Sequence, residues 1–282
     1  MCLKTDIFPI NYFKSIWNPL TAFKNRFKLN TLMMIVIFIF LNALMVIPVT
    51  LNYAKMDTFP LEEYYPNAVQ MLDDETVSAL QETTVDQGEL FIETPFIIEN
   101  DYGVIAGGLT EAEFEEEVES PNFILFGQNQ FVIGEEDYPI GTIPYTRDFT
   151  LEGVDTVEEL ESELSRQWFN QNRMLVVLVF SLMIGVFLIV MNVLLVLGSA
   201  LLIYFTRSGQ FTTISTYKES VNLMLNSLGV PTLIAMVFGL FYFDMFLMVT
   251  IQSLGLVVYL IIIWAKVQFN DYNLEKRMEK NE

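Results

Sequence analysis

The feature that most constrains this chain is a run of 33 consecutive uncharged residues between Arg173 and Arg207. Most of these residues are Leu, Val, Ile, Met or Phe. A helix of this length, rising about 1.5 Å per residue, spans about 50 Å, whereas the hydrocarbon core of a bilayer is about 30 Å thick. The run therefore predicts a membrane-spanning helix, placed at 173–204, that tilts or extends into the aqueous zone on one side.

Three further uncharged apolar segments predict additional membrane spans at 32–51, 221–243 and 245–264. A mean hydropathy of +0.40 fits such a chain. The first span follows a long basic segment, and the residues after it, Ile47 to Asn52, lack a small-residue cleavage site. We therefore expect a retained anchor in place of a cleaved signal peptide.

The acidic residues are concentrated in one region of the chain. Residues 52–172 hold 28 of the 35 Asp and Glu residues, opposed there only by Lys55, Arg147 and Arg166, so this region has a net charge of −25 while the whole chain has −20. About 120 residues are enough for one small domain between the first and second spans. No basic surface is available there to neutralise phosphates, which excludes nucleic acid as an expected partner.

Local patterns within this region predict a mixed α+β domain. A helix is expected from Asp73, and a capping box joins Thr110 to Glu113 at the start of an acidic helix. Apolar runs flanking the turn 127–130 predict a β-hairpin. The prolines and the glycine of 139–144 predict a loop.

A second helical pattern leads directly into the long apolar run. No glycine or proline lies between Thr156 and Met174, so we predict one continuous helix from Thr156 to Tyr204. Gln167 occupies an ordinary position of this helix, so we expect Gln167→Ala to leave the helix nearly unchanged. Such a helix would couple the acidic domain to the bilayer.

The distribution of basic residues predicts the orientation of the four spans. The leader 1–31, the loop 205–220 and the tail 265–282 fall on one side of the membrane if the spans alternate. They carry eleven of the 15 Lys and Arg residues, namely Lys4, Lys14, Lys24, Arg26, Lys28, Arg207, Lys218, Lys266, Lys276, Arg277 and Lys280. The positive-inside rule then puts both termini in the cytoplasm and residues 52–172 outside.

The composition disfavours several kinds of chemistry. The chain has no histidine and a single cysteine, Cys2, which excludes a Cys/His zinc site and a Ser-His-Asp triad. The glutamates of 111–119 lack the spacing of a calcium-binding loop and are expected to form a solvated helix face. No pair of carboxylates stands out for glycoside hydrolysis. The sequence thus predicts no catalytic residue, no metal site and no cofactor.

Polar residues in the predicted spans or between two of them are the candidate site residues. They are Asn192, Asn222, Asn226, Gln252 and Asp244. Side-chain amides in a bilayer commonly join helices by hydrogen bonds, and the alternative is a transport path. Asp244 is the one ionisable member, and it lies at the apex between the third and fourth spans. The aromatic and basic leader has two interpretations as well: a segment lying in the membrane interface, or a plain basic leader.

Several short motifs carry a family resemblance. They are Trp17-Asn18-Pro19, Ile47-Pro48-Val49, Pro95-Phe96-Ile97-Ile98-Glu99-Asn100, Asn122-Phe123-Ile124-Leu125-Phe126, Tyr217-Lys218-Glu219-Ser220 and Leu228-Gly229-Val230-Pro231-Thr232. Over nearly its whole length the chain resembles a multi-pass membrane protein family of Gram-positive bacteria. Some members are described as maltodextrin utilisation membrane proteins because they are encoded beside maltodextrin uptake systems. The resemblance implies an accessory role near sugar uptake and assigns no functional residue.

Together these observations predict a membrane protein with four transmembrane α-helices and a small α+β extracytoplasmic domain inserted between helices 1 and 2. The expected partners are the lipid bilayer and a sugar transporter or another membrane protein. The expected function is that of a non-enzymatic accessory protein of the plasma membrane. Two alternatives remain open: a sensor that relays the state of the domain to the cytoplasm, and a small transporter.

Overall fold

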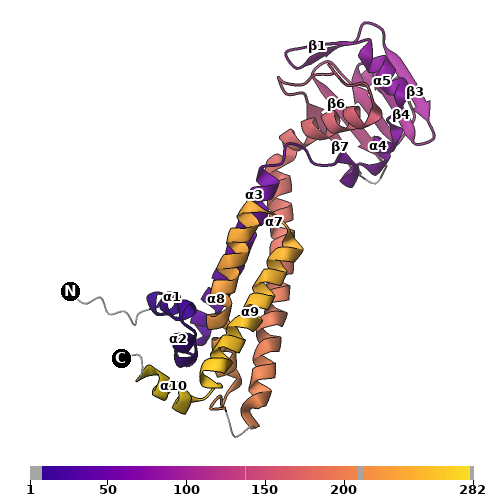
Figure 1. The fold of residues 1–282 in the computed structure, drawn as a ribbon. Helices are drawn as coiled ribbons and strands as arrows, with labels where there is room; N and C mark the ends of the chain where they lie inside the picture. Colours follow the sequence, from indigo (N-terminus) through magenta and orange to yellow (C-terminus); the bar gives the residue numbers. More distant parts are fainter. Residues whose placement is uncertain (1–7, 137, 209–211, 280–282) are drawn as a thin grey trace. The chain divides into compact units, whose positions relative to one another are not determined.

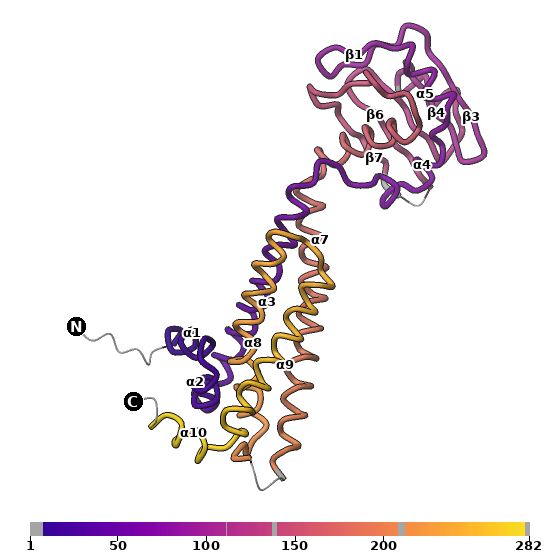
Figure 2. The backbone as a smooth tube through the Cα atoms, viewed as in Figure 1, coloured from indigo at the N-terminus to yellow at the C-terminus, as the bar shows by residue number. Residues whose placement is uncertain are grey.

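The computed structural model describes residues 8–136, 138–208 and 212–279 (Figures 1 and 2). The chain divides into two compact units. Unit 1 comprises Met1–Ala54 and Val177–Glu282, and unit 2 comprises Lys55–Val176. Unit 1 is a helix bundle, and unit 2 is a mixed α and β domain whose residues lie between the first and second long helices in the sequence.

Unit 1 contains the long apolar helices. They are α3 (Thr31–Ala54), the C-terminal part of α7 (Val157–Phe205), α8 (Tyr217–Phe241) and α9 (Met245–Val267), each long and apolar enough to cross a membrane. Shorter elements complete the unit: α1 (Ile10–Trp17), α2 (Pro19–Lys24), η2 (Thr206–Ser208) and α10 (Asp271–Met278). The four predicted spans are confirmed as helices of this kind, and they fit a multi-pass membrane protein.

Helix α8 lies at the centre of the bundle. In its most apolar segment 61% of the residues are buried, against 22–33% for the other three long helices, because α8 packs against both α3 and α9. Pro231 lies within α8, and a Cβ added to Gly255 of α9 would stand 2.8 Å from the Cβ of Pro231. Glycine therefore lets α8 and α9 approach closely at this level, as small residues do between membrane helices.

Unit 2 is built on a five-stranded sheet. Its strands, in spatial order, are β3 (Phe96–Asn100), β4 (Gly103–Gly107), β5 (Phe123–Phe126), β6 (Gln130–Glu135) and β7 (Tyr138–Pro144). All neighbours are antiparallel except β4 and β5, which are parallel and joined through α6 (Glu111–Glu117). A separate hairpin pairs β1 (Thr84–Asp86) with β2 (Glu89–Phe91). The remaining elements are η1 (Leu61–Glu63), α4 (Pro66–Met71) and α5 (Asp74–Gln81).

Both faces of this sheet bury apolar side chains. On one face Leu125 and Val132 join a cluster with Phe114 of α6. Ile124 and Ile133 point to the opposite face because side chains alternate along a strand, and α4 packs against the central strands. Burial on both faces explains why β5 and β6 consist of continuous apolar runs instead of alternating ones.

The local predictions for unit 2 are mostly confirmed. The capping box of Thr110 and Glu113 is formed, Asp73 caps α5, and β5 and β6 form the expected hairpin. The loop predicted over 139–144 is wrong, because these residues belong to β7. This strand lies at the edge of the sheet, where proline is tolerated since only one neighbour requires ladder hydrogen bonds.

Helix α7 is continuous over Val157–Phe205, as predicted, and contributes residues to both units. The expectation for Gln167 is wrong, because this side chain is fully buried. Its Oε1 accepts hydrogen bonds from the backbone N–H (2.8 Å) and the hydroxyl (2.9 Å) of Thr146, and its amide donates to Glu163 (2.8 Å). Alanine at this position would leave these groups unpaired at a cost of about 1–3 kcal/mol.

Candidate functional site

Residues 8–31 of the N-terminal leader fold back onto the bundle. Helices α1 and α2 pack against α8 and α9, and Figure 1 shows them with α10 at one end of the unit. The Tyr12 hydroxyl donates to the Leu225 carbonyl (3.2 Å), and the Tyr259 hydroxyl donates to the Ile16 carbonyl (2.7 Å). The leader is therefore a structural part of the bundle, which goes beyond both interpretations of its sequence.

The side chains of the leader differ in their exposure to solvent. Tyr12, Ile16 and Phe23 are buried in the bundle, while Trp17 and Phe27 remain 67% and 60% exposed. Aromatic side chains exposed beside membrane helices suit the interface between lipid and water. The leader thus buries one set of apolar side chains in the bundle and leaves two aromatic side chains exposed.

A glycine of α8 makes room for the leader. A Cβ built on Gly229 would stand 2.6 Å from Cγ2 of Ile16 and 3.0 Å from the Tyr12 hydroxyl oxygen. Contacts below 3.0 Å require something to move, so only glycine fits at this position while α1 remains in place.

A buried arginine lies where three distant segments meet. Arg26 follows α2, and its side chain is fully buried. Its Nε donates to the carboxylate of Glu219, its Nη2 donates to both carboxylate oxygens of Asp271 (2.7 and 2.9 Å), and its Nη1 donates to the Phe23 carbonyl (3.0 Å). The Phe27 ring lies 4.2 Å from the guanidinium carbon. Hydrogen bonds and an aromatic face thus surround the charge.

The two carboxylates of this charge cluster, Arg26, Glu219 and Asp271, are held in different ways. Glu219 is buried, and its second oxygen accepts from the backbone N–H of Ser215 (2.9 Å) and from that of Thr216 (3.4 Å), the N-cap residue of the capping box that begins α8. Asp271 is partly exposed at the start of α10. Burial acts to raise the pKa of Asp271, but hydrogen bonds from Arg26 and Thr213, together with the positive charge of Arg26, hold that pKa below its usual value.

The charge cluster therefore fastens the leader to the first turn of α8 and to α10. Separating a buried ion pair leaves an uncompensated charge in a low-dielectric environment, which is costly. Its arrangement is that of a structural clamp, because each oxygen of Glu219 and each nitrogen of the guanidinium is engaged within the protein.

The candidate residues Asn222 and Asn226 also bind the leader. Both are buried on α8, and their amides donate to the carbonyls of Leu29 and Ala22, each at 3.2 Å. Their spacing of four residues puts them on one helix face, as the sequence indicates. The structure thus directs this face towards the leader.

The other candidates join pairs of helices or cap one. The Asn192 amide of α7 donates to Oδ1 of Asn42 on α3 (2.9 Å), and the Gln252 amide of α9 donates to the Thr232 hydroxyl of α8 (2.8 Å). Asp244 caps α9 by accepting from the Leu247 backbone N–H (2.9 Å). The five candidates therefore make five separate hydrogen bonds and do not form one cluster.

Sequence reasoning missed the charge cluster: it counted Arg26 among the basic residues of the leader, quoted Glu219 only within the motif Tyr217-Lys218-Glu219-Ser220, and gave Asp271 no role. One signal was available for Glu219: Thr216 and Glu219 have the same spacing as the capping box of Thr110 and Glu113. Nothing in the sequence connects Asp271 with Arg26. Among the described residues, no group of three or more Asp, Glu or Cys is arranged to hold a metal ion.

Comparisons with known proteins identify relatives of the whole chain. No protein-family model matches it, and no solved structure matches it. It is 32% identical over 271 residues to the maltodextrose utilization protein MalA of Streptococcus pneumoniae, covering 95% of this chain and 99% of the relative. It is 22% identical over 263 residues to the putative maltodextrin utilization protein YvdJ of Bacillus subtilis, covering 90% and 87%. The resemblance inferred from the sequence is confirmed, and the chain belongs to the maltodextrose utilization protein family represented by MalA.

Proposed function

We propose that this chain is a non-enzymatic accessory protein of maltodextrin utilisation that acts in the plasma membrane beside a sugar transporter. The observation that carries the proposal is the use of the polar side chains in the bundle. Asn222 and Asn226 hold the leader, and Asn192 and Gln252 each join two helices. Groups engaged in this way support a fixed bundle that anchors unit 2, and the names of the relatives point to maltodextrin.

Uptake measurements distinguish the proposed accessory role from the alternative that the chain itself transports sugar. Cells lacking the chain should take up labelled maltotriose more slowly than cells producing it, whereas proteoliposomes holding only the pure chain should show the same flux as empty liposomes. Flux in the pure system would contradict the accessory role in favour of the transporter. Unchanged uptake in the cells would remove the link to maltodextrin.

The proposed orientation has both termini in the cytoplasm and unit 2 outside. The leader, the 212–219 segment and α10 meet at one end of the bundle through Arg26. Together these parts of the chain contain eight lysine and arginine residues against four aspartate and glutamate residues. That arrangement agrees with the positive-inside rule.

Single-cysteine labelling should reveal this orientation. In a Cys2→Ser background, Glu116→Cys and Tyr272→Cys introduce thiols at exposed positions of α6 and α10. An impermeant maleimide should label position 116 in intact cells and position 272 only after permeabilisation. The reverse pattern would invert the proposed topology.

A sensor is the second candidate function, and the continuity of α7 favours it. One helix contributes Trp168 to the core of unit 2 and Val196 to the core of unit 1. In this second candidate function, a conformational change in unit 2 is transmitted along α7 to unit 1 without a flexible linker.

A proline in α7 should disrupt this coupling. Gln171 is exposed in unit 2, so Gln171→Pro removes a helical hydrogen bond without removing a buried side chain, at a local cost of about 3 kcal/mol. Spin labels at positions 152 and 178 in the Cys2→Ser background should give a narrow distance distribution in the parent and in Gln171→Ala, and a broad one in Gln171→Pro. A broad distribution in the parent would exclude mechanical transmission through α7.

A further inference from the structure

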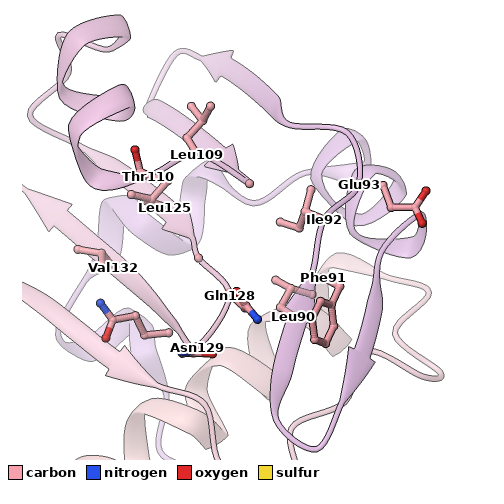
Figure 3. A pocket seen from close by; sticks show the side chains of 13 residues that line it. Leu90, Phe91, Ile92, Glu93, Leu109, Thr110, Leu125, Gln128, Asn129 and Val132 are labelled. Carbon is pink, nitrogen blue, oxygen red and sulfur yellow. The ribbon is translucent and has the colours of Figure 1, made fainter.

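A hollow of about 780 Å³ opens on the α6 side of the sheet in unit 2. It lies between the chain leaving β2, the segment after β4 and the turn joining β5 to β6. Figure 3 shows Leu109, Leu125 and Val132 on one side and Ile92 on the other, with Gln128 between them. The volume lies within the range of about 300–1,000 Å³ typical of small-molecule sites.

The hollow is amphipathic and has no positive charge. Leu125 and Val132 are buried sheet residues that form an apolar floor. The exposed rim bears the amides of Gln128 and Asn129, and one N–H of the Gln128 amide donates to the Glu89 carboxylate (3.0 Å). The Thr110 hydroxyl at the rim is already engaged with Glu113 in the capping box of α6. Glu93 also borders the hollow, but Figure 3 shows its carboxylate directed away from it. No lysine or arginine lines it among the described residues.

The rim amides suit hydroxyl groups in particular. Each amide both donates and accepts hydrogen bonds, as a sugar hydroxyl does. The backbone of the turn is already paired, since the Gly127 N–H donates to the Gln130 carbonyl (2.9 Å) and the Asn129 carbonyl accepts from the Tyr145 N–H (3.0 Å). The side chains at the turn are thus presented on a fixed backbone.

The charge of the domain narrows the ligand class further. Residues 52–172 have a net charge of −25, so the field around the hollow opposes anionic ligands such as phosphates and uronic acids. A neutral molecule with apolar C–H faces and many hydroxyls matches both the floor and the rim.

We propose that this hollow binds a short neutral oligosaccharide of the α-glucan type, an assignment that rests on the proposed function for its choice of sugar. The C–H face of the glucan would lie over Leu125 and Val132, and its hydroxyls would meet the amides of Gln128 and Asn129. The chain would thereby bind the solute whose uptake it assists.

Calorimetric titration of the full chain in nanodiscs tests the site. Nanodiscs avoid maltoside detergents, whose head group would compete. Maltotriose and maltoheptaose are the probes, and a trisaccharide of galacturonic acid is the anionic comparison. The parent should bind both glucans and bind the anionic trisaccharide at least tenfold more weakly.

The variants locate the binding. Gln128→Ala with Asn129→Ala changes only exposed side chains and should weaken glucan binding about tenfold, since two hydrogen-bonding groups are lost. Leu109→Trp should fill the hollow and weaken binding at least as much, while Gln171→Ala, another exposed amide of unit 2, should bind as the parent does.

Two results would overturn the inference: no heat of binding for either glucan, or equal affinity in the parent and in both hollow variants. The uptake assay described above separates this failure from that of the proposed function. A chain that binds no glucan but still accelerates uptake would contradict the site alone, and a chain that binds glucan without affecting uptake would contradict the function alone.

Discussion

Arg26→Met should lower the free energy of unfolding of unit 1 by about 3–5 kcal/mol, because it leaves the buried Glu219 carboxylate without its cation. Glu219 is almost fully buried, and the Asp271 carboxylate would lose both of its hydrogen bonds to Arg26. The leader should detach from α8 as a result. Denaturant titration of the full chain in mild detergent measures the stability, and tryptic cleavage at Lys14 measures detachment.

Two further variants separate the ion pair from general effects of the substitution. Lys24→Met removes an exposed charge in the same segment and should change stability by no more than about 0.5 kcal/mol. Adding Glu219→Gln to Arg26→Met should recover part of the loss, because the orphaned charge is then removed. Equal stability of the Arg26 and Lys24 variants would contradict the role assigned to the charge cluster.

Gly229→Leu should displace the leader from the bundle. The new side chain would occupy the space of Ile16, and overpacking of this kind costs about 1–3 kcal/mol even where neighbours can adjust. Leucine is a better helix former than glycine, so a loss of stability would come from the collision with α1. The tryptic cleavage assay should show faster cutting of the leader, by about tenfold for a loss near 1.4 kcal/mol.

Gly198→Leu is the matched control. It makes the same substitution in α7, at an exposed position where a Cβ meets no heavy atom within 4 Å. Its leader should be cut at the parent rate. If both glycine variants behave alike, the close contact of Gly229 with Ile16 and Tyr12 does not hold the leader in place.

The membrane-spanning helices could be predicted because a long uncharged apolar run strongly favours a helix in lipid. An uncharged run from Met174 to Thr206 is stable as a helix in lipid, where every backbone group must be paired within its own segment. Capping boxes and short turns are equally local, which explains the success at Thr110 and at the hairpin of β5 and β6.

Features that depend on tertiary position could not be predicted in this way. The prolines of β7 are compatible with a strand only because β7 lies at the edge of the sheet, and that position depends on the other four strands. Gln167 is buried because the chain after β7 returns to α7 and presents Thr146.

The contacts of Arg26 with Glu219 and Asp271 also depend on tertiary position and could not be predicted. Arg26 is 193 residues from Glu219 and 245 from Asp271 in sequence, so no local pattern links them. The count of basic residues treated Arg26 as a solvated charge of the leader. The apolar residues around it, Phe23 and Phe27, were equally compatible with an interfacial segment.

Copurification tests the accessory role most directly. The tagged full chain, cross-linked in cells that grow on maltodextrin and extracted in mild detergent, should enrich the subunits of a sugar transporter well above a control membrane protein of similar abundance. The same enrichment should persist in Lys24→Met and fall in Arg26→Met if the partner requires an intact bundle. Recovery of the chain without any transport protein, from cells in which it accelerates maltotriose uptake, would contradict the account.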